Sequence, residues 1–402
     1  MGIRFAWNWR RAQQDKTMLV SRLRLRNWRN FRELDIPLRD TTYLLGANAT
    51  GKSNLLDVFR FLRDIGKAEG GGLQKAIADR QGISKLRCLH ARRERDVVID
   101  VELAENFGPD GVAWRYLLAF APEGKGAQRT LVTQEKVWKG AAQILLLDRP
   151  TEDEKRDPAR LTQTHLQQVD ANAAFREIAD FFSDTVYLHV VPQLLKYGDR
   201  IGGHPLDDDP FGQGLLESMA KVKDRTRDLR LKRIQETLRQ AIPRFEELRF
   251  IRDNIDGRPH LEARYVHHRP HAGWQREDQF SDGTLRLIGL LWSLLSGNSL
   301  LLLEEPELSL NDSIVKQIPQ MLQRLRRDSK RKRQIILSTH SEALLSNEGI
   351  DGREIVILEP GPEGSTARVP NEHEVAALAS GLSPAEVILP VTRPTGLERL
   401  AL

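Results

Sequence analysis

The chain has 402 residues, a net charge of +5 and 40% hydrophobic residues, the composition of a soluble globular protein with a large core. No apolar run approaches the ~20 residues that cross a bilayer, and the longest, 285–295, is interrupted by polar residues. The single cysteine, Cys88, excludes an internal disulfide and a cysteine-ligated zinc site. We therefore expect a cytoplasmic protein with no membrane partner.

Residues 1–17 show no periodicity and lack the apolar segment of a secretory signal, so we expect an N-terminal extension. From Leu19 to Arg26 apolar and polar residues alternate, which predicts a half-buried strand. The segment Asn27-Trp28-Arg29-Asn30-Phe31 interrupts this alternation, which resumes at 34–38.

The next segment matches the phosphate-binding loop G-x-x-x-x-G-K-[ST] over the residues Gly46-Ala47-Asn48-Ala49-Thr50-Gly51-Lys52-Ser53. An apolar run precedes it and a helical pattern that includes Asn54 follows, as the motif requires. In such a loop, backbone N–H groups surround phosphate oxygens and the helix N-terminus adds positive potential. Lys52 can reach the β- and γ-phosphates, and the Ser53 hydroxyl can bind Mg²⁺. The sequence thus predicts a nucleotide site over 46–54.

The region after this helix predicts a change of architecture. Four strand patterns, at 96–103, 113–121, 130–138 and 143–147, are joined by turn-rich segments and predict an antiparallel β region inside an α/β frame. Polar, helix-forming sequence from 151 to 243 predicts a helical lobe between two halves of the frame, 18–150 and 244–402. No heptad pattern is sustained, so no long coiled coil is expected.

A second motif is acidic and follows four consecutive leucines in the segment Leu300-Leu301-Leu302-Leu303-Glu304-Glu305-Pro306-Glu307. The leucines predict a central parallel strand, whose carboxyl end is where ligands bind in open α/β sheets. Glu304 would hold Mg²⁺ beside Ser53, and Glu305 would orient and deprotonate the attacking water. The alternative is an acidic helix N-cap after a core strand, and the phosphate loop favours the catalytic interpretation.

Two further motifs complete the pattern. An apolar run from Gln334 ends in Ser338-Thr339-His340-Ser341, where the histidine can contact the γ-phosphate or be merely structural. Phe280-Ser281-Asp282-Gly283-Thr284 opens the apolar helix 287–295. A turn of this kind at a helix N-terminus offers a hydroxyl and free N–H groups to an anion.

Basic residues cluster in two places, which a solvated helix face or a nucleic-acid surface would explain. The first cluster comprises Arg324, Arg326, Arg327, Lys330, Arg331, Lys332 and Arg333. The second comprises Lys221, Lys223, Arg225, Arg227, Arg230, Lys232 and Arg233.

The order of these motifs resembles the ABC-type ATPase heads of RecF, the SMC proteins and the overcoming-lysogenization-defect (OLD) family. It is most similar to small stand-alone RecF-like bacterial ATPases of the AAA_21 type. The resemblance rests on the segments 27–31, 46–53, 280–284, 303–307 and 338–341 and covers nearly the whole chain from Met18. It implies a parallel core sheet with an antiparallel β subdomain, and ATP and Mg²⁺ as cofactors.

The resemblance also implies how the site works. Two heads of this class dimerise head-to-tail around two ATP molecules, and higher oligomers are possible. Residues 46–54, Glu304, Glu305 and His340 would act on one nucleotide, with Lys52, Glu305 and His340 as the catalytic group. Ser281 and Gly283 would complete the site of the partner subunit, so that ATP joins the dimer and hydrolysis releases it.

Several departures from the class are visible. The Ser281-Asp282-Gly283-Thr284 signature differs from that of transporters and disfavours transport. Glu304 stands where many relatives have aspartate, and the glutamine that senses Mg²⁺ is not assignable, with Gln74 and Gln81 as candidates. No C-terminal nuclease domain is recognisable, so any cleavage would need a partner.

Two functions follow from the resemblance. The first is a switch ATPase that controls a separate, nuclease-like effector in anti-phage defence. The second is a RecF-like repair or maintenance ATPase that clamps double-stranded DNA. Basic clusters that line one groove would favour DNA, and scattered basic residues would favour a protein partner.

Overall fold

The computed structural model describes residues 18–91, 94–108, 110–124, 129–201, 211–255, 257–267, 273–297, 299–328 and 333–392. The predicted extension, 1–17, lies outside them. Contacts divide the chain into two compact units. The first unit comprises the chain up to residue 185 together with 298–302 and 326–402, and the second comprises 186–297 and 303–325.

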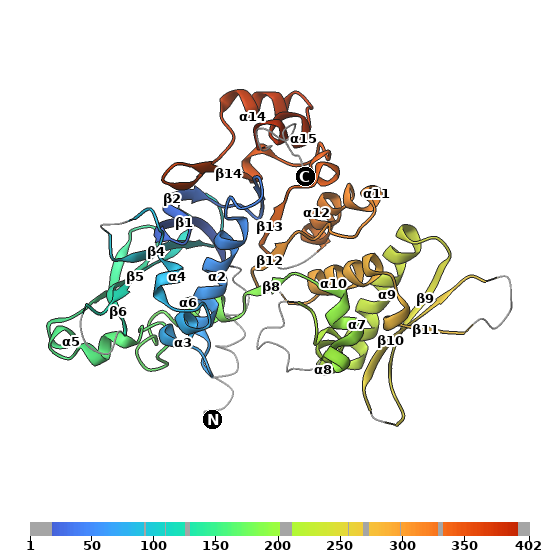
Figure 1. Cartoon of the computed structure of the whole chain (residues 1–402), viewed down its shortest axis with the longest axis horizontal. Coiled ribbons are helices and arrows are strands. Elements are labelled where there is room, and N and C mark those ends of the chain that lie inside the picture. Colours follow the sequence, from blue (N-terminus) through green and yellow to red (C-terminus); the bar gives the residue numbers. More distant parts are fainter. Residues whose placement is uncertain are drawn as a thin grey trace, which may run out of the picture. The chain divides into compact units, whose positions relative to one another are not determined.

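An antiparallel sheet with the strand order β2-β1-β4-β5-β6-β7 makes up one part of the first unit (Figure 1). Burial alternates along the middle of β1, as the sequence pattern predicts for a strand with one buried face. The four strands predicted between 96 and 147 are present as β4 to β7. The bounds are β1 Leu19–Trp28, β2 Phe31–Pro37, β4 Val97–Ala104, β5 Val112–Pro122, β6 Thr130–Lys139 and β7 Ile144–Arg149.

A second sheet of this unit has the order β15-β14-β3-β13 and carries the phosphate loop. The central strand β3 runs parallel to β13 and to β14, while β15 returns antiparallel to β14. All five residues of β3 are buried, as expected for a strand covered on both faces. The bounds are β3 Thr41–Leu45, β13 Ile335–Thr339, β14 Ile355–Gly361 and β15 Gly364–Arg368.

Helix α2, Lys52–Gly66, follows the phosphate loop and packs against α6, Arg176–Ser183. Its buried face includes Leu55, Phe59 and Leu62. The remaining helices of the first unit are short. They are α3 Leu73–Ala78, α4 Ile83–Leu86, α5 Glu152–Arg156, η1 Pro158–Thr162, α13 Glu342–Leu345, η3 Gly352–Glu354, α14 Glu372–Ala379, α15 Pro384–Val387 and α16 Leu389–Thr392.

The second unit combines helices with a three-stranded antiparallel sheet, β11-β10-β9 (Figure 1). One apolar core joins α8, α9 and α10 to β9 and β10, which pair as an antiparallel hairpin. The bounds are β8 Val186–Leu188, α7 Pro192–Ile201, α8 Leu215–Lys221, α9 Asp224–Ala241, β9 Phe245–Arg252, β10 Pro259–Tyr265, β11 Gln275–Arg276, η2 Glu277–Gln279, α10 Asp282–Leu295 and α11 Asp312–Val315. Two elements cross the division between the units, β12 Leu301–Glu304 and α12 Ile318–Asp328.

The boundaries between the units differ from those the composition indicated. Residues 151–185, expected in the helical lobe, belong to the first unit, and residues 244–297 belong to the second. The reason lies in the contacts of the buried Glu135 carboxylate on β6. It accepts hydrogen bonds from the backbone N–H groups of His165 and Leu166, which attaches this segment to the antiparallel sheet.

The longest helix in the described part of the chain is α9, with 18 residues, and no long coiled coil is present there. None of the described helices is both long and apolar enough to span a bilayer.

Candidate nucleotide-binding site

The phosphate loop of the first unit has the predicted strand–loop–helix geometry. It leaves β3 after Leu45 and enters α2 at Lys52. Gly51 has a left-handed backbone with φ 99°, and Ala49, at the exposed tip beside Asn48, has φ 66°. Glycine is needed at 51 because a side chain is strained in this region. The loop is therefore a tight turn with left-handed backbone at Ala49 and Gly51.

Lys52 lies across the loop rather than in solvent. Its Nζ donates to the backbone oxygens of Gly46, at 2.8 Å, and Ala47, at 3.2 Å, and the residue is buried. Ser53 is exposed in the first turn of α2, and that turn contains no acidic side chain. The positive potential of the helix N-terminus is thus not offset there, which suits an anion.

The turn between β1 and β2 supports the phosphate loop through hydrogen bonds. Asn30 Nδ2 donates to the backbone oxygen of Thr50, at 2.8 Å, and its Oδ1 accepts from Asn54 Nδ2, also at 2.8 Å. Trp28 Nε1 donates to the backbone oxygen of Asn54 at 2.9 Å. The sequence marks 27–31 as an interruption of a strand pattern and as part of the family resemblance, but it does not predict this contact with the phosphate loop.

A second support comes from the far end of the chain. Asn30 Nδ2 also donates to Ser365 Oγ, at 2.8 Å, and Ser365 N donates to the backbone oxygen of Asn30. Ser365 lies on β15 and was missed by sequence reasoning, because no local pattern distinguishes it from other serines. These bonds join β15 to the turn that holds the phosphate loop.

Charged groups hold the same turn against α2. The carboxylate of Asp57 on α2 pairs with Arg29 of the turn and with Arg80. Burial raises the pKa of Asp57, but the positive charges of Arg80 and Arg29 outweigh burial and keep its pKa below the usual range. The ion pairs of Asp57 with Arg29 and Arg80 are therefore charged at neutral pH, and they hold the turn between β1 and β2 against α2.

His340 lies at the same edge of the sheet as the phosphate loop. Strand β13 runs parallel to β3 with Thr339 opposite Leu45, so the residues that follow, His340 and Gly46, leave the sheet side by side. His340 is exposed. The structure thus brings together the predicted histidine and the loop.

The two carboxylates after the leucine strand belong to the second unit. Leu301, Leu302 and Leu303 are buried in β12, as predicted for a covered strand. Glu304 ends β12, and its side chain accepts a hydrogen bond from the Tyr187 hydroxyl. Glu305 has a left-handed backbone, φ 44°, which is uncommon for a residue with a side chain and concentrates at functional sites.

The Ser281–Gly283 turn lies beside the loop that follows these carboxylates. Ser281 is the N-cap of α10, and its Oγ accepts from Thr284 N at 3.1 Å. A Cβ on Gly283 would lie 2.5 Å from the backbone oxygen of Ser309, so only glycine fits. The second unit therefore assembles the signature turn and the acidic loop in one place.

Arg286, one turn into α10, joins the two motifs electrostatically. Burial lowers the pKa of its guanidinium, and the negative charges of Asp282, Glu305 and Glu307 oppose this effect. A positive charge therefore remains beside the acidic loop.

The two glutamine candidates for a metal sensor lie on α3 and in the turn after it. Gln74 Nε2 donates to the backbone oxygens of Thr130 and Thr162, both at 2.8 Å. Gln81 has a left-handed backbone, φ 64°.

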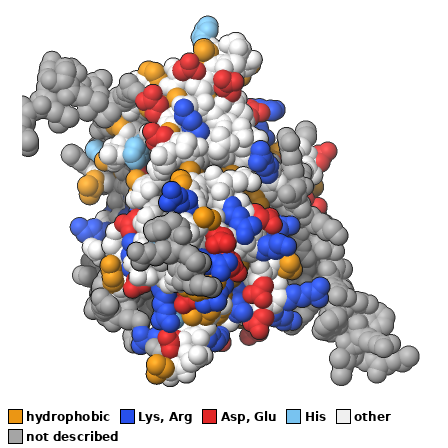
Figure 2. Space-filling model, turned by 90° about the vertical axis from the view of Figure 1, so that its right-hand side faces the viewer, with side chains coloured by type: hydrophobic (Ala, Val, Ile, Leu, Met, Phe, Trp, Pro, Cys, Tyr) orange, Lys and Arg blue, Asp and Glu red, His pale blue; other side chains and the backbone are white. Residues whose placement is uncertain are grey.

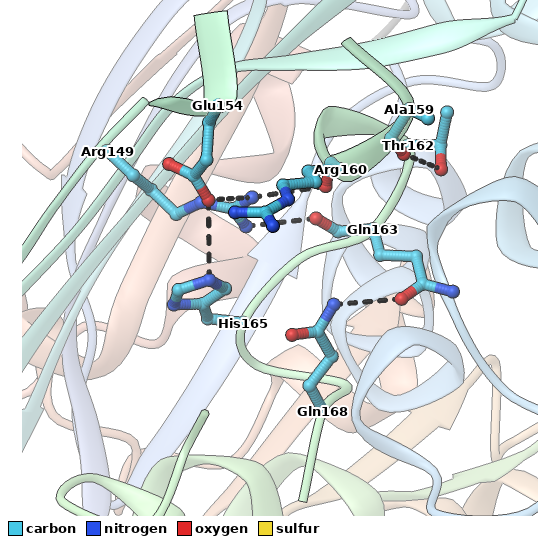
Figure 3. A pocket seen from close by; sticks show the side chains of 8 residues that line it. All are labelled: Arg149, Glu154, Ala159, Arg160, Thr162, Gln163, His165 and Gln168. Carbon is cyan, nitrogen blue, oxygen red and sulfur yellow. Dashed lines mark hydrogen bonds and ion pairs between the residues drawn. The ribbon is translucent and has the colours of Figure 1, made fainter. Parts of the chain in front are cut away.

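A polar cavity of about 500 Å³ lies in the first unit, and none of the predicted site residues lines it. Figure 3 shows Arg149 and Glu154 paired beside His165 at its wall. Arg149 is also paired with Glu135, and both side chains are inaccessible to solvent. The residues that line the cavity are Arg149, Glu154, Ala159, Arg160, Thr162, Gln163, His165 and Gln168.

Comparison with known proteins agrees with this geometry. The model of the AAA_21 family, described as "AAA domain, putative AbiEii toxin, Type IV TA system", matches residues 42–346. The chain belongs to this family. The matched range contains the phosphate loop, the signature turn, the acidic loop and His340 of this AAA_21 protein. No curated protein matches the chain.

Solved structures give the fold of this AAA_21 protein. An Smc head bound to the C-winged helix domain of ScpA is 16% identical, with a TM-score of 0.52 over 88% of this chain and 99% of that one. A Pyrococcus furiosus Smc head with an extended coiled coil is 14% identical, with a TM-score of 0.48 over 90% and 99%. The SMC head from Thermotoga maritima is also 14% identical, with a TM-score of 0.45 over 88% and 99%. The first likeness shows that the chain has the fold of an SMC-type ATPase head.

Proposed function

We propose that this AAA_21 protein is a Mg²⁺-dependent ATPase that dimerises around ATP and controls a separate effector in bacterial anti-phage defence. The observation that carries the ATPase part is the phosphate loop. Its lysine lies against the loop, its helix begins without an acidic residue, and two distant segments support it. Such a preorganised anion site binds a triphosphate without first having to order itself.

The residues present fit a magnesium ion. Mg²⁺ takes oxygen ligands, usually one or two protein groups beside phosphates and waters. Ser53 supplies an exposed hydroxyl in the first turn of α2, and Glu304 supplies a carboxylate at the end of β12. When bound, the ion would neutralise charge on the phosphates. We propose Ser53 and Glu304 as its protein ligands.

Each of the other proposed site residues would have its own role in hydrolysis. The Lys52 ammonium group would bind the β- and γ-phosphates, and the Glu305 carboxylate would orient water and accept its proton. The His340 imidazole would contact the γ-phosphate. Ser281 Oγ and the N–H groups at the start of α10 would bind the nucleotide of a second subunit, and the nearby Arg286 adds positive charge.

The charge distribution favours a protein partner over DNA. On the face that Figure 2 shows, Lys and Arg side chains lie among Asp and Glu side chains instead of forming a stripe of one sign. In the second basic cluster, Arg227 pairs with Asp224 and stacks on Phe250, while Arg230 stacks on Trp292. These two arginines act in packing, so they contribute less to a phosphate-binding surface.

The first basic cluster gives the same indication where the structure describes it. Arg324 is exposed, but Arg333 is buried and donates to the backbone oxygen of Ser299. The side chains of the other members lie outside the described residues, namely Arg326, Arg327, Lys330, Arg331 and Lys332. The alternative, a RecF-like clamp on double-stranded DNA, rests on the exposed remainder of the second cluster, such as Arg225 and Lys232.

The test is the mass in solution of the Glu305→Gln variant with ATP and Mg²⁺, with and without a short DNA duplex. Loss of the catalytic base should trap the ATP-bound dimer. The matched control is the double variant Lys52→Ala/Glu305→Gln, which should stay monomeric because it binds no ATP. A Glu305→Gln protein that stays monomeric with ATP would contradict the dimer, and wild-type turnover by Lys52→Ala would contradict the site.

The DNA arm separates the two roles. An ATP-dependent dimer that ignores the duplex supports control of a protein effector, and the next step is co-purification with the products of neighbouring genes. A dimer that binds the duplex with an affinity that falls steeply with salt supports the DNA clamp instead.

A further inference from the structure

The carboxylate of Glu304 is held by a strand that no sequence motif marks. Strand β8 has three residues, and its central residue, Tyr187, is buried. The Tyr187 hydroxyl donates a hydrogen bond to Glu304 Oε2. One residue beyond β8, His189 Nδ1 lies 3.2 Å from the backbone oxygen of Glu304. The strand therefore contacts both the side chain and the backbone of this glutamate, and all three residues belong to the second unit.

A tyrosine hydroxyl is suited to hold a carboxylate without occupying it. It has one proton to donate, whereas an ionised carboxylate has two oxygens with about four acceptor positions. One bond from the hydroxyl therefore uses only one of these acceptor positions. Hydrogen bonds to a charged acceptor are roughly twice as strong as neutral ones, so this contact can select one rotamer.

The contact also suits the length of the Glu304 side chain. Glutamate has one more rotatable bond to order than aspartate. Ordering a long side chain costs conformational entropy, up to about 2 kcal/mol when it is fully fixed. The Tyr187 hydroxyl binds the far end of the longer side chain, where an aspartate carboxylate would fall short by one methylene group.

We propose that Tyr187 is a positioning residue that orders the Glu304 carboxylate for Mg²⁺, a role that rests on the proposed function. Partners that hydrogen-bond a metal-ligating carboxylate typically change metal affinity 10–100-fold when they are removed. Tyr187 would act through Glu304 rather than by binding the ion itself. A purely structural role would be different, because the hydroxyl would then only satisfy its own burial and would not affect the metal.

The first test is the Tyr187→Phe variant, with Mn²⁺ as a paramagnetic probe and a non-hydrolysable ATP analogue. The variant should bind Mn²⁺ about tenfold more weakly, while its affinity for the analogue in the presence of a chelator stays unchanged. The matched control is Tyr116→Phe, which removes a buried hydroxyl that donates to Glu135 Oε1 at 3.0 Å in the antiparallel sheet. This control should lose stability without losing Mn²⁺ affinity.

The second test asks whether the two side chains act together. In the Glu304→Asp background the carboxylate no longer reaches the hydroxyl, so Tyr187→Phe should cause no further loss of Mn²⁺ affinity. Equal losses in both backgrounds would overturn the proposal, as would a Tyr187→Phe variant with wild-type Mn²⁺ affinity.

The outcomes distinguish this inference from the proposed function. A wild-type chain that binds no Mn²⁺ with the analogue and hydrolyses no ATP overturns both. Another outcome is that the wild type binds Mn²⁺ and hydrolyses ATP, while Tyr187→Phe has a lower melting temperature but the same Mn²⁺ affinity. That outcome overturns only the role of Tyr187.

Discussion

Asn30 and Gly51 are packed so closely that no side chain fits between them. A Cβ on Gly51 would lie 2.2 Å from Asn30 Nδ2 and 2.5 Å from Asn30 Oδ1. The glycine of the phosphate-loop motif is therefore required twice, once for its left-handed backbone and once for this contact. The second requirement is a property of the fold and not of the nucleotide.

We predict that Gly51→Ala lowers both stability and ATP affinity. The left-handed backbone alone costs about 1–2 kcal/mol for a residue with a side chain, and overpacking against Asn30 adds about 1–3 kcal/mol. Chemical unfolding and titration with a fluorescent ATP analogue measure the two effects.

Gly381→Ala is the control for this substitution. Gly381 has the same backbone φ, 99°, but nothing lies within 4 Å of its ideal Cβ position. It should show the backbone cost alone and bind ATP normally. If both variants lose the same stability and both bind ATP, the contact with Asn30 has no energetic role.

We predict that Asn30→Asp weakens ATP binding about tenfold or more. The substitution keeps the shape but removes the Nδ2 hydrogen bond to Thr50 and places a carboxylate against this backbone oxygen, while the Ser365 hydroxyl can donate to the new carboxylate. Leaving a buried acceptor unpaired costs about 1–3 kcal/mol. Ser365→Ala removes only the bond between Asn30 Nδ2 and the hydroxyl and should have a smaller effect in the same calorimetric titration.

Asn172→Asp provides the comparison. Asn172 is also buried and its Nδ2 donates to the backbone oxygen of Leu166, far along the chain from the loop. It should lose stability with unchanged ATP affinity. Equal ATP affinity in Asn30→Asp and Asn172→Asp would refute a specific support of the loop by Asn30.

We predict that Ser281→Asp keeps the fold and abolishes the ATP-dependent dimer. Aspartate is as good an N-cap as serine and suits the positive end of α10. Its negative charge, however, would repel the phosphates of a second subunit's nucleotide. Light scattering with ATP in the Glu305→Gln background measures the effect.

Ser281→Ala serves as the converse control. This substitution removes the N-cap, which lowers the stability by about 1 kcal/mol, and it adds no charge. The melting temperature should therefore fall while some dimer remains. A Ser281→Asp protein that dimerises with ATP would place Ser281 outside the interface.

We predict that His165 makes the stability fall below about pH 6.5. Burial and the positive charge of Arg149 lower the pKa of His165 from its ordinary 6.5, although Glu135 and Glu154 oppose them. The unfolded chain therefore binds the proton more readily, and stability is lost as pH falls through the folded-state pKa. Urea unfolding from pH 7.5 to 5 should show a steeper decline for the wild type than for His165→Gln. Parallel curves would mean that His165 titrates alike in both states.

The sequence was sufficient to predict the elements on which the proposed site lies. Local patterns determine the phosphate loop, the leucine strand and the helix after Ser281, because a strand or helix period and a motif lie within a few residues of one another. The adjacency of His340 and the loop also agrees with the topology, since carboxyl ends of parallel strands meet at one edge.

The supports of these motifs were not predictable from local patterns. Tyr187 contacts Glu304 across 117 positions, and Asn30 contacts Ser365 across 335 positions. Their residue types are common, and only tertiary structure selects these particular ones. The boundary near residue 151 differed for the same reason, because the contacts of Glu135 with 165 and 166 outweigh the local change in composition.

The hairpin of β14 and β15 has a consequence for the order of events during synthesis. Ser365 helps to hold the turn at Asn30, and a Cβ on Gly364 would lie 2.5 Å from the backbone oxygen of Asn30. The loop at 46–53 leaves the ribosome more than three hundred residues before this hairpin. A nascent chain must therefore carry an unsupported phosphate loop until this hairpin has left the ribosome, and its capacity to hold a nucleotide should emerge only then.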